Sequence, residues 1–269
     1  MKIITGGVCA AQGFKASGVH CGIRRNQTKK DLALIVSDKK AVTCAVYTKN
    51  LVKGAPLLVT KENISDDYAQ AVICNSGNAN TCNANGVEIA TQMCELVEKA
   101  TGVAKNDVVV ASTGVIGQPL CIDPIANSMD NLASLLSYDG NFDCASAIMT
   151  TDTVQKEVAV EFEIDGTVCR MGGIAKGSGM IHPDMATMLV FITSDVSISK
   201  EMLQKALSTD VDNTFNMLSV DGDTSTNDMV SLLCSGLSSN DEITDFGEDY
   251  DTFKSALFEV LRKLSMMIA

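Results

Sequence analysis

Apolar residues follow two spacings along the chain, one typical of strands and one typical of helices. Short apolar or alternating runs predict buried strands, and they fall at residues 31–37, 41–48, 70–75, 107–112, 158–164, 167–172 and 188–192. Apolar residues three and four positions apart predict helices, at residues 87–100, 122–137, 141–150, 199–206 and 251–269. Strands and helices therefore interleave, which predicts an α/β protein.

Polar residues between these runs predict how neighbouring elements connect. Asp38-Lys39-Lys40 separates two strand-like runs and suggests a hairpin with a short polar loop, and Gly166 suggests a second hairpin. Gly102 follows a helical run as an expected stop, and Ser199 precedes another as an expected N-cap.

Length and charge narrow the classes of function. The chain has 269 residues, enough for one large domain or two modest ones, and 46% of them are hydrophobic. The formal net charge of −12 argues against nucleic acid or an anionic membrane surface as a partner. No apolar run reaches transmembrane length, so we expect a cytoplasmic protein.

Cysteine and histidine spacing argues against a metal or disulfide framework. The ten cysteines form no Cys-x-x-Cys pair, and with two histidines they make a poor zinc pattern, so we expect reduced thiols and no metal. The oxygen-rich loop from Asp221 to Asp228 fails the EF-hand spacing, with no glycine at its sixth position and Leu232 at its twelfth. His20 is interpreted as a packed or hydrogen-bonded structural residue.

Two stretches carry residues suited to catalysis. Lys176 lies in a glycine-rich turn shortly before Thr187, which opens the apolar run 188–192, so a hydroxyl nucleophile would lie beside a cation. Thr113-Gly114 follows the run 107–112, where a glycine lets the backbone present an N–H to a developing oxyanion. From spacing alone, a structural threonine and an ordinary turn are the more common explanations of these two stretches.

The segment from Lys176 to Leu189, Lys-Gly-Ser-Gly-Met-Ile-His-Pro-Asp-Met-Ala-Thr-Met-Leu, resembles the self-processing segment of the ornithine acetyltransferase (glutamate N-acetyltransferase) family. Residues 13–22 and 75–80 resemble further segments of that family. The resemblance implies cleavage of the Ala186–Thr187 bond and a nucleophilic role for the freed Thr187. It also implies an oxyanion hole at Thr113 and Gly114, and substrate contacts from Thr150, Lys176 and Thr187.

The same resemblance implies a fold and an assembly. We expect stacked β-sheet layers with outer helices, the self-processing DmpA-like fold. Residues 1–186 would form an amino-terminal (alpha) chain segment and residues 187–269 the start of a carboxy-terminal (beta) one, paired as a heterodimer, with higher homo-oligomers left open. Because family members continue beyond this length and the last helical run has no stop signal, we expect a chain that lacks the carboxy-terminal part.

The implied reaction is a two-step acetyl transfer. Cleavage would give Thr187 a free α-amine with a reference pKa of about 7.7–8.0, able to take the hydroxyl proton. The family's substrates are N2-acetylornithine and glutamate, with no cofactor and with acetyl-CoA as a further donor in some members. Alternatives are an aminopeptidase or amidase of related fold and an inactive fragment of the acetyltransferase. A non-catalytic anion-binding module is a third, although Lys176-Gly177-Ser178 lacks P-loop spacing.

Overall fold

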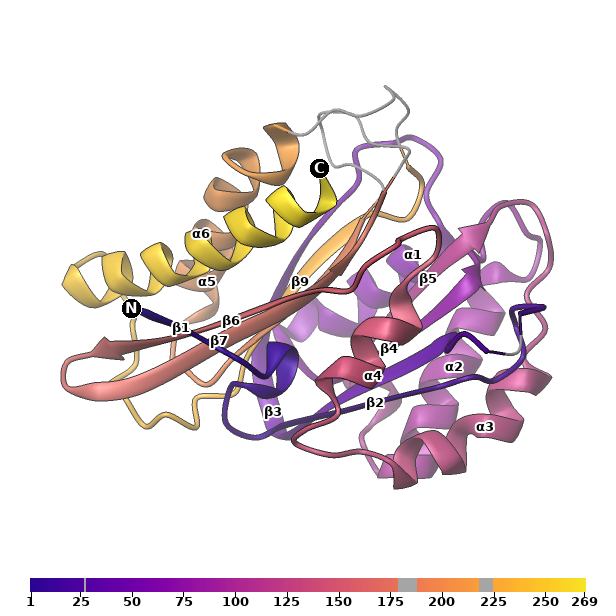
Figure 1. Cartoon of the computed structure of the whole chain (residues 1–269), viewed down its shortest axis with the longest axis horizontal. Coiled ribbons are helices and arrows are strands. Elements are labelled where there is room, and N and C mark those ends of the chain that lie inside the picture. The colour runs from indigo at the N-terminus through magenta and orange to yellow at the C-terminus, as the bar shows by residue number, and fades with distance from the viewer. Residues whose placement is uncertain (27, 179–187, 218–224) are drawn as a thin grey trace.

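The computed structural model describes residues 1–26, 28–178, 188–217 and 225–269 (Figure 1). Within this part of the chain the strands are β1 (Lys2–Ile4), β2 (Phe14–Val19), β3 (Leu32–Tyr47), β4 (Tyr68–Asn78), β5 (Val108–Val115), β6 (Lys156–Ile164), β7 (Thr167–Lys176), β8 (Leu189–Ser194) and β9 (Met229–Cys234). The helices are α1 (Ala55–Asn63), α2 (Gly86–Thr101), α3 (Asp123–Ser134), α4 (Asn141–Ile148), α5 (Lys200–Asp212) and α6 (Glu248–Ile268).

All strands belong to one hydrogen-bonded sheet in the order β1-β6-β7-β8-β9-β3-β4-β5, with β2 added to β3. The pairs β4–β5 and β8–β9 are parallel, and the other pairs are antiparallel. β3 joins the two parts of this order, β1 to β9 on one side and β4 and β5 on the other. Its first half pairs with β2 and its second half with β9. The two ends of the sheet can therefore stack on each other around β3.

Three apolar clusters show that the two ends of the sheet stack on each other. An inner cluster joins residues of β3, β4, β5 and α4 to residues of β7, β8 and β9. One outer cluster packs α5 and α6 on β6 to β9, and the other packs α2 and α3 on β4 and β5. Figure 1 shows α5 and α6 on one side of the strands and α2 and α3 on the other. The predicted class, stacked β-layers with outer helices, is confirmed.

The alternation within β4 shows how sequence builds these layers. Ala71 and Ile73 belong to the outer cluster with α2 and α3, whereas Val72 and Cys74 belong to the inner cluster. Successive side chains of a strand point to opposite faces. A strand that is apolar at every position is therefore buried on both sides, as β4 is here.

The other local predictions are largely confirmed. Ser199 caps α5 by accepting the Met202 N–H, and Gly102 ends α2 in the left-handed conformation with φ +79°. β6 and β7 form the predicted hairpin, with positive φ at Asp165 and Gly166 in its turn. Strands β1, β2 and β9 and helix α1 were not predicted.

The hairpin predicted around Asp38-Lys39-Lys40 is wrong. Both flanking runs belong to β3, which pairs with β4 on either side of an irregularity between Val36 and Ala41. Tight hairpin turns favour glycine or asparagine at positive φ, and none of residues 38–40 has a positive φ. The three polar residues instead form an exposed bulge in one long strand.

The predicted alpha and beta segments share this architecture. β8 lies between β7 and β9, and β9 pairs with β3. The described parts of residues 1–186 and 187–269 therefore form common cores. All ten cysteines are free thiols. None of the described helices combines the length and apolar composition that a membrane span requires.

Candidate active site

The two residues predicted as an oxyanion hole lie where the parallel strands β4 and β5 end together. Thr113 lies opposite Ser76, and Gly114 lies opposite Gly77. A Cβ on Gly114 would lie 2.3 Å from the Gly77 carbonyl carbon and 2.6 Å from the Asn78 nitrogen, and the φ of Gly114 is +132°. Only glycine fits this close approach of two backbones.

Lys176 joins this place from another strand. It ends β7, and its Nζ donates a hydrogen bond to Thr113 Oγ1 at 3.0 Å. Since the Thr113 oxygen accepts this bond, its own O–H remains available to donate elsewhere. Burial lowers the pKa of the Lys176 ammonium, and the carboxylates of Asp152 and Asp228 oppose that shift. Two predicted site residues 63 positions apart are thus in direct contact.

Asp152 anchors the chain that follows β7. Its carboxylate accepts the Gly177 N–H at 2.8 Å and the Thr150 N–H at 3.0 Å, and it pairs with Lys156. Burial alone would raise the pKa of Asp152, but these bonds outweigh it and lower the pKa. Thr150, a predicted substrate contact, is half-buried beside this carboxylate. Asp152 therefore holds Thr150 and the turn after Lys176 together.

Asp228 anchors the chain that enters β8. Its Oδ1 accepts the Met188 N–H at 2.9 Å. Burial raises the pKa of Asp228 well above its usual range, against the opposing effects of Ser225, the Met188 N–H and Lys176. The predicted scissile pair, Ala186 and Thr187, lies outside the described residues.

Asn227 ties the ends of several strands together. Its amide nitrogen donates to the carbonyls of Ala79 at 2.7 Å and Ser112 at 2.9 Å. Its amide oxygen accepts from the hydroxyls of Thr81 and Thr226. Asn227, two residues before β9, therefore fixes the end of β5 next to Thr113.

Sequence reasoning missed Asp152, Asp228 and Asn227 as site residues. Asp152 lies two residues after the predicted substrate contact Thr150, and the other two lie at the end of the oxygen-rich loop from Asp221 to Asp228. What the sequence does not contain is the set of N–H and carbonyl groups that the fold brings to these side chains.

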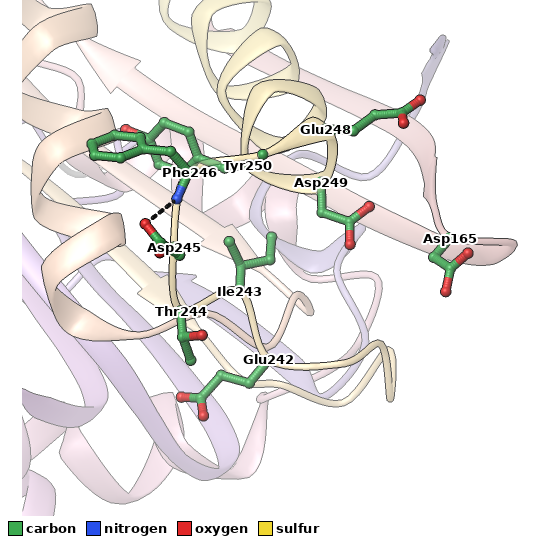
Figure 2. A pocket seen from close by; sticks show the side chains of 10 residues that line it. Asp165, Glu242, Ile243, Thr244, Asp245, Phe246, Glu248, Asp249 and Tyr250 are labelled. Atoms are coloured by element: carbon green, nitrogen blue, oxygen red, sulfur yellow. Dashed lines mark hydrogen bonds between the residues drawn. The ribbon is translucent and has the colours of Figure 1, made fainter.

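A separate pocket lies at the start of α6 (Figure 2). Five carboxylates, a phenylalanine and a tyrosine are among its lining residues: Asp165, Glu242, Asp245, Glu248, Asp249, Phe246 and Tyr250. Its negative charge would repel an amino-acid carboxylate, and none of the predicted site residues lines it. No group of three or more His, Cys, Asp or Glu among the described residues is arranged to hold a metal ion.

Comparison with known proteins places this site in a family context. A model described as the ArgJ family matches residues 15–269. The arginine biosynthesis bifunctional protein ArgJ of Caldanaerobacter subterraneus subsp. tengcongensis and the glutamate N-acetyltransferase of Methanocaldococcus jannaschii are each 45% identical across the whole chain. The chain covers 66% and 65% of these relatives, so it spans about two thirds of their length.

Solved structures of an ArgJ protein and of an ornithine acetyltransferase are also similar to this chain. The ArgJ structure of Bacillus halodurans is 41% identical with a TM-score of 0.64, and the match covers 69% of this chain and 97% of that chain. The ornithine acetyltransferase of Mycobacterium tuberculosis, complexed with ornithine, is 34% identical with a TM-score of 0.63, over 68% of this chain and 97% of that one.

The L-aminopeptidase D-Ala-esterase/amidase of Ochrobactrum anthropi, described as a variant of the Ntn hydrolase fold, is 13% identical with a TM-score of 0.55 over 100% of this chain and 87% of that one. This likeness shows a common fold alone. The family model and the relatives that are 45% identical throughout show more: this chain belongs to the ArgJ family.

Proposed function

We propose that this chain is the self-cleaving, nucleophile-bearing part of an acyltransferase that moves acetyl from N2-acetylornithine to glutamate in arginine biosynthesis. The observation that carries the proposal is the hydrogen bond from Lys176 to Thr113, beside Gly114. It joins a cation and a hydroxyl group beside Gly114, an exposed residue, where β7 ends and β8 begins. Family membership supplies the identity of the substrates.

Thr187 acts as the nucleophile. It is bonded directly to Met188, whose N–H is held by Asp228, and Gly177 at the other end of the connection is held by Asp152. Lys176 and Leu189 lie opposite each other in the β7–β8 pair. The connection that carries the Ala186–Thr187 bond therefore starts and finishes beside the proposed oxyanion hole.

The extent of the structural matches supports cleavage at this bond. The B. halodurans and M. tuberculosis chains are matched over 97% of their own length, yet cover 69% and 68% of this 269-residue chain. Those shares correspond to about 186 and 183 residues. The proposed amino-terminal segment, 1–186, has nearly the same length.

The chemistry then follows in two balanced steps. The Thr187 α-amine takes the hydroxyl proton, Oγ attacks the acetyl carbonyl, and the amide C–N bond breaks to release ornithine with that proton. The glutamate amine then attacks the ester carbonyl, and the C–O bond to Thr187 Oγ breaks. The proton lost by the attacking amine returns to Oγ through the α-amine, which gives N-acetylglutamate and the free Thr187 hydroxyl. In both steps the Gly114 N–H and the Thr113 O–H bind the oxyanion, which contributes about 3–4 kcal/mol per donor in comparable sites.

Lys176 and Thr150 contact the substrate in this scheme. One of the three Lys176 N–H groups binds Thr113, which leaves two for a substrate carboxylate. Acetyl-CoA enters as a second acetyl donor to the same hydroxyl. After cleavage the segments 1–186 and 187–269 remain one heterodimeric unit, because β8 pairs with β7 and β9 pairs with β3.

Intact mass spectrometry of the purified protein tests the proposal. Wild type should give fragments of 186 and 83 residues, Thr187→Ser should still split, and Thr187→Ala should remain whole. Incubation with N2-acetylornithine should add one acetyl group to the shorter fragment, and glutamate should remove it faster than water does. A wild-type chain that stays whole and takes up no acetyl would overturn the proposal, and removal by water alone would indicate an amidase.

A further inference from the structure

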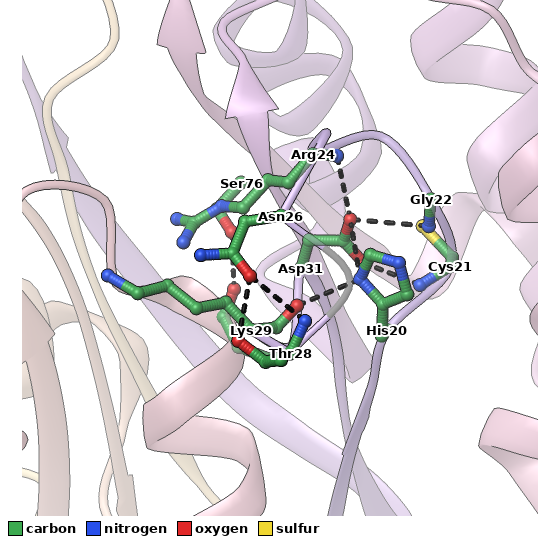
Figure 3. Close-up of polar contacts among 10 residues, drawn as sticks. His20, Cys21, Gly22, Arg24, Asn26, Thr28, Lys29, Asp31 and Ser76 are labelled. Atoms are coloured by element: carbon green, nitrogen blue, oxygen red, sulfur yellow. Dashed lines mark hydrogen bonds and ion pairs between the residues drawn. The ribbon is translucent and has the colours of Figure 1, made fainter.

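The loop after β2 is built around one buried carboxylate (Figure 3). Asp31 has no exposed surface and accepts backbone N–H groups from Cys21 at 2.6 Å, Gly22 at 3.3 Å and Arg24 at 2.9 Å. His20 Nδ1 lies 3.5 Å from the same carboxylate. Backbone donors and His20 therefore surround Asp31 and fix the loop in place.

Arg24 contributes its backbone to this arrangement but not its guanidinium. Figure 3 shows the guanidinium directed away from Asp31 and toward Ser76. The side chain crosses Gly77 so closely that a Cβ there would lie 2.9 Å from Arg24 Cγ. Gly77 lies opposite Gly114 in the β4–β5 pair, so Arg24 lies beside the proposed oxyanion hole.

The guanidinium is left with an unused donor. Arg24 Nη2 is buried and has no hydrogen-bond partner among the described residues. Burial lowers the pKa of Arg24, against the opposing charges of Asp31, Asp152 and Cys74. Leaving a buried charged donor without an acceptor is costly, and native proteins rarely do so without a reason. A bound anion would supply the acceptor.

Lys176 and Arg24 both act on this part of the structure. Burial raises the pKa of Cys74 to about 12, and the two cations oppose that shift together, so both lie near the end of β4. Asp152 also acts on both cations. Lys176 uses one of its N–H groups to bind Thr113. The Arg24 guanidinium would add donors in the planar geometry that matches a carboxylate.

We propose that Arg24 binds the substrate α-carboxylate next to Lys176. This inference rests on the proposed function, because it takes its substrates from there. A cation that serves both half-reactions must bind a group that donor and acceptor share. The ornithine side chain ends in an ammonium and that of glutamate in a carboxylate, so the α-carboxylate is the shared group.

Calorimetric titration with two ligand pairs tests this assignment. Putrescine is ornithine without its α-carboxylate. γ-Aminobutyrate is glutamate without its α-carboxylate. Arg24→Gln should weaken ornithine and glutamate binding about 10- to 100-fold, the range for one hydrogen bond to a charged group, and leave the two decarboxylated ligands unchanged. Arg25→Gln, the same charge change at the exposed neighbouring residue, should leave all four unchanged.

The other outcomes overturn the assignment. Equal weakening of ornithine and putrescine would mean that Arg24 only supports the loop, and weakening of glutamate alone would place its contact at the side-chain carboxylate. Arg24→Lys, which keeps the charge without the fork, should give an intermediate loss and serves if Arg24→Gln does not fold. Suppose that Arg24→Gln weakens the binding of ornithine but not of putrescine, while the wild-type chain is never cleaved. This result would refute the proposed function and leave the Arg24 role standing. A wild-type chain that is cleaved and transfers acetyl, with ornithine and glutamate affinities that Arg24→Gln does not change, would refute the Arg24 role alone.

Discussion

Replacing Gly114 with alanine tests the contact between β4 and β5 at the proposed oxyanion hole. The new Cβ would lie 2.3 Å from the Gly77 carbonyl carbon and 2.6 Å from both the Gly77 oxygen and the Asn78 nitrogen. These are backbone atoms of a paired strand, so they cannot rotate away as a flexible side chain would. The strands must separate, or the backbone of residue 114 must change conformation.

The expected loss has two parts. Forcing a side chain into a tightly packed place costs about 1–3 kcal/mol. Alanine at φ +132° adds backbone strain of about 1–3 kcal/mol. The free energy of unfolding should therefore fall by about 2–6 kcal/mol. Acetyl transfer should also slow, because moving Thr113 would break the hydrogen bond of 3.0 Å between Lys176 Nζ and Thr113 Oγ1.

Urea unfolding provides the measurement, and Gly117→Ala is the matched control. Gly117 follows the same strand with φ +78°, but a Cβ there would meet nothing within 4 Å. It shares the positive φ without the clash, so its loss should stay at about 1–2 kcal/mol. Equal losses in the two variants would show that backbone conformation, and not contact with β4, sets the cost at Gly114.

Three further changes have defined outcomes. Burial raises the pKa of Asp210 to about 6, with Lys254 opposing, so the folded state holds this proton more tightly and stability falls by about 2 kcal/mol as pH rises from about 4 to 6. Asp210→Asn should remove that fall and stabilise the protein at pH 7, as urea unfolding at pH 4.5 and 7.5 will show. Thr113→Val should lower the rate of acetyl transfer about 100- to 1,000-fold and Thr113→Ser much less, measured by single-turnover acetylation. Asn227→Ala leaves two carbonyls and two hydroxyls without their partner, so urea unfolding should show a loss of about 2–4 kcal/mol.

Local pattern was enough to predict most elements because burial imposes its period on each strand and helix. It failed at residues 38–40, where the choice between a hairpin and one long strand depends on β9, about 190 residues later. β9 itself, Met229–Cys234, is buried at all six positions, and a short run that is apolar except at Ser231 is typical of a buried strand. Helix α1 begins at Gly54-Ala55-Pro56, where the early proline favours a helix start.

The candidate site also has a part that the sequence predicts and a part that only the fold shows. Lys176 and Thr113 were predicted separately, from a glycine-rich turn and a strand end, and only the fold shows that they touch. Asp152, Asp228 and Arg24 gave no comparable signal, because their roles depend on backbone groups and burial supplied by distant segments. Spacing can identify a reactive side chain, but it cannot identify the groups that orient it.

The position of the proposed cleavage explains how the fold can tolerate a broken backbone. The strands on either side of it are paired through six residues each, Met171 to Lys176 with Leu189 to Ser194, and β8 also pairs with β9. Asp152 and Asp228 hold Gly177 and Met188 through side chains that do not depend on the connection between them. Breaking the Ala186–Thr187 bond therefore removes none of these hydrogen bonds. It leaves the inner cluster, which draws on both segments, intact, so the new amine is released into a site that is already assembled.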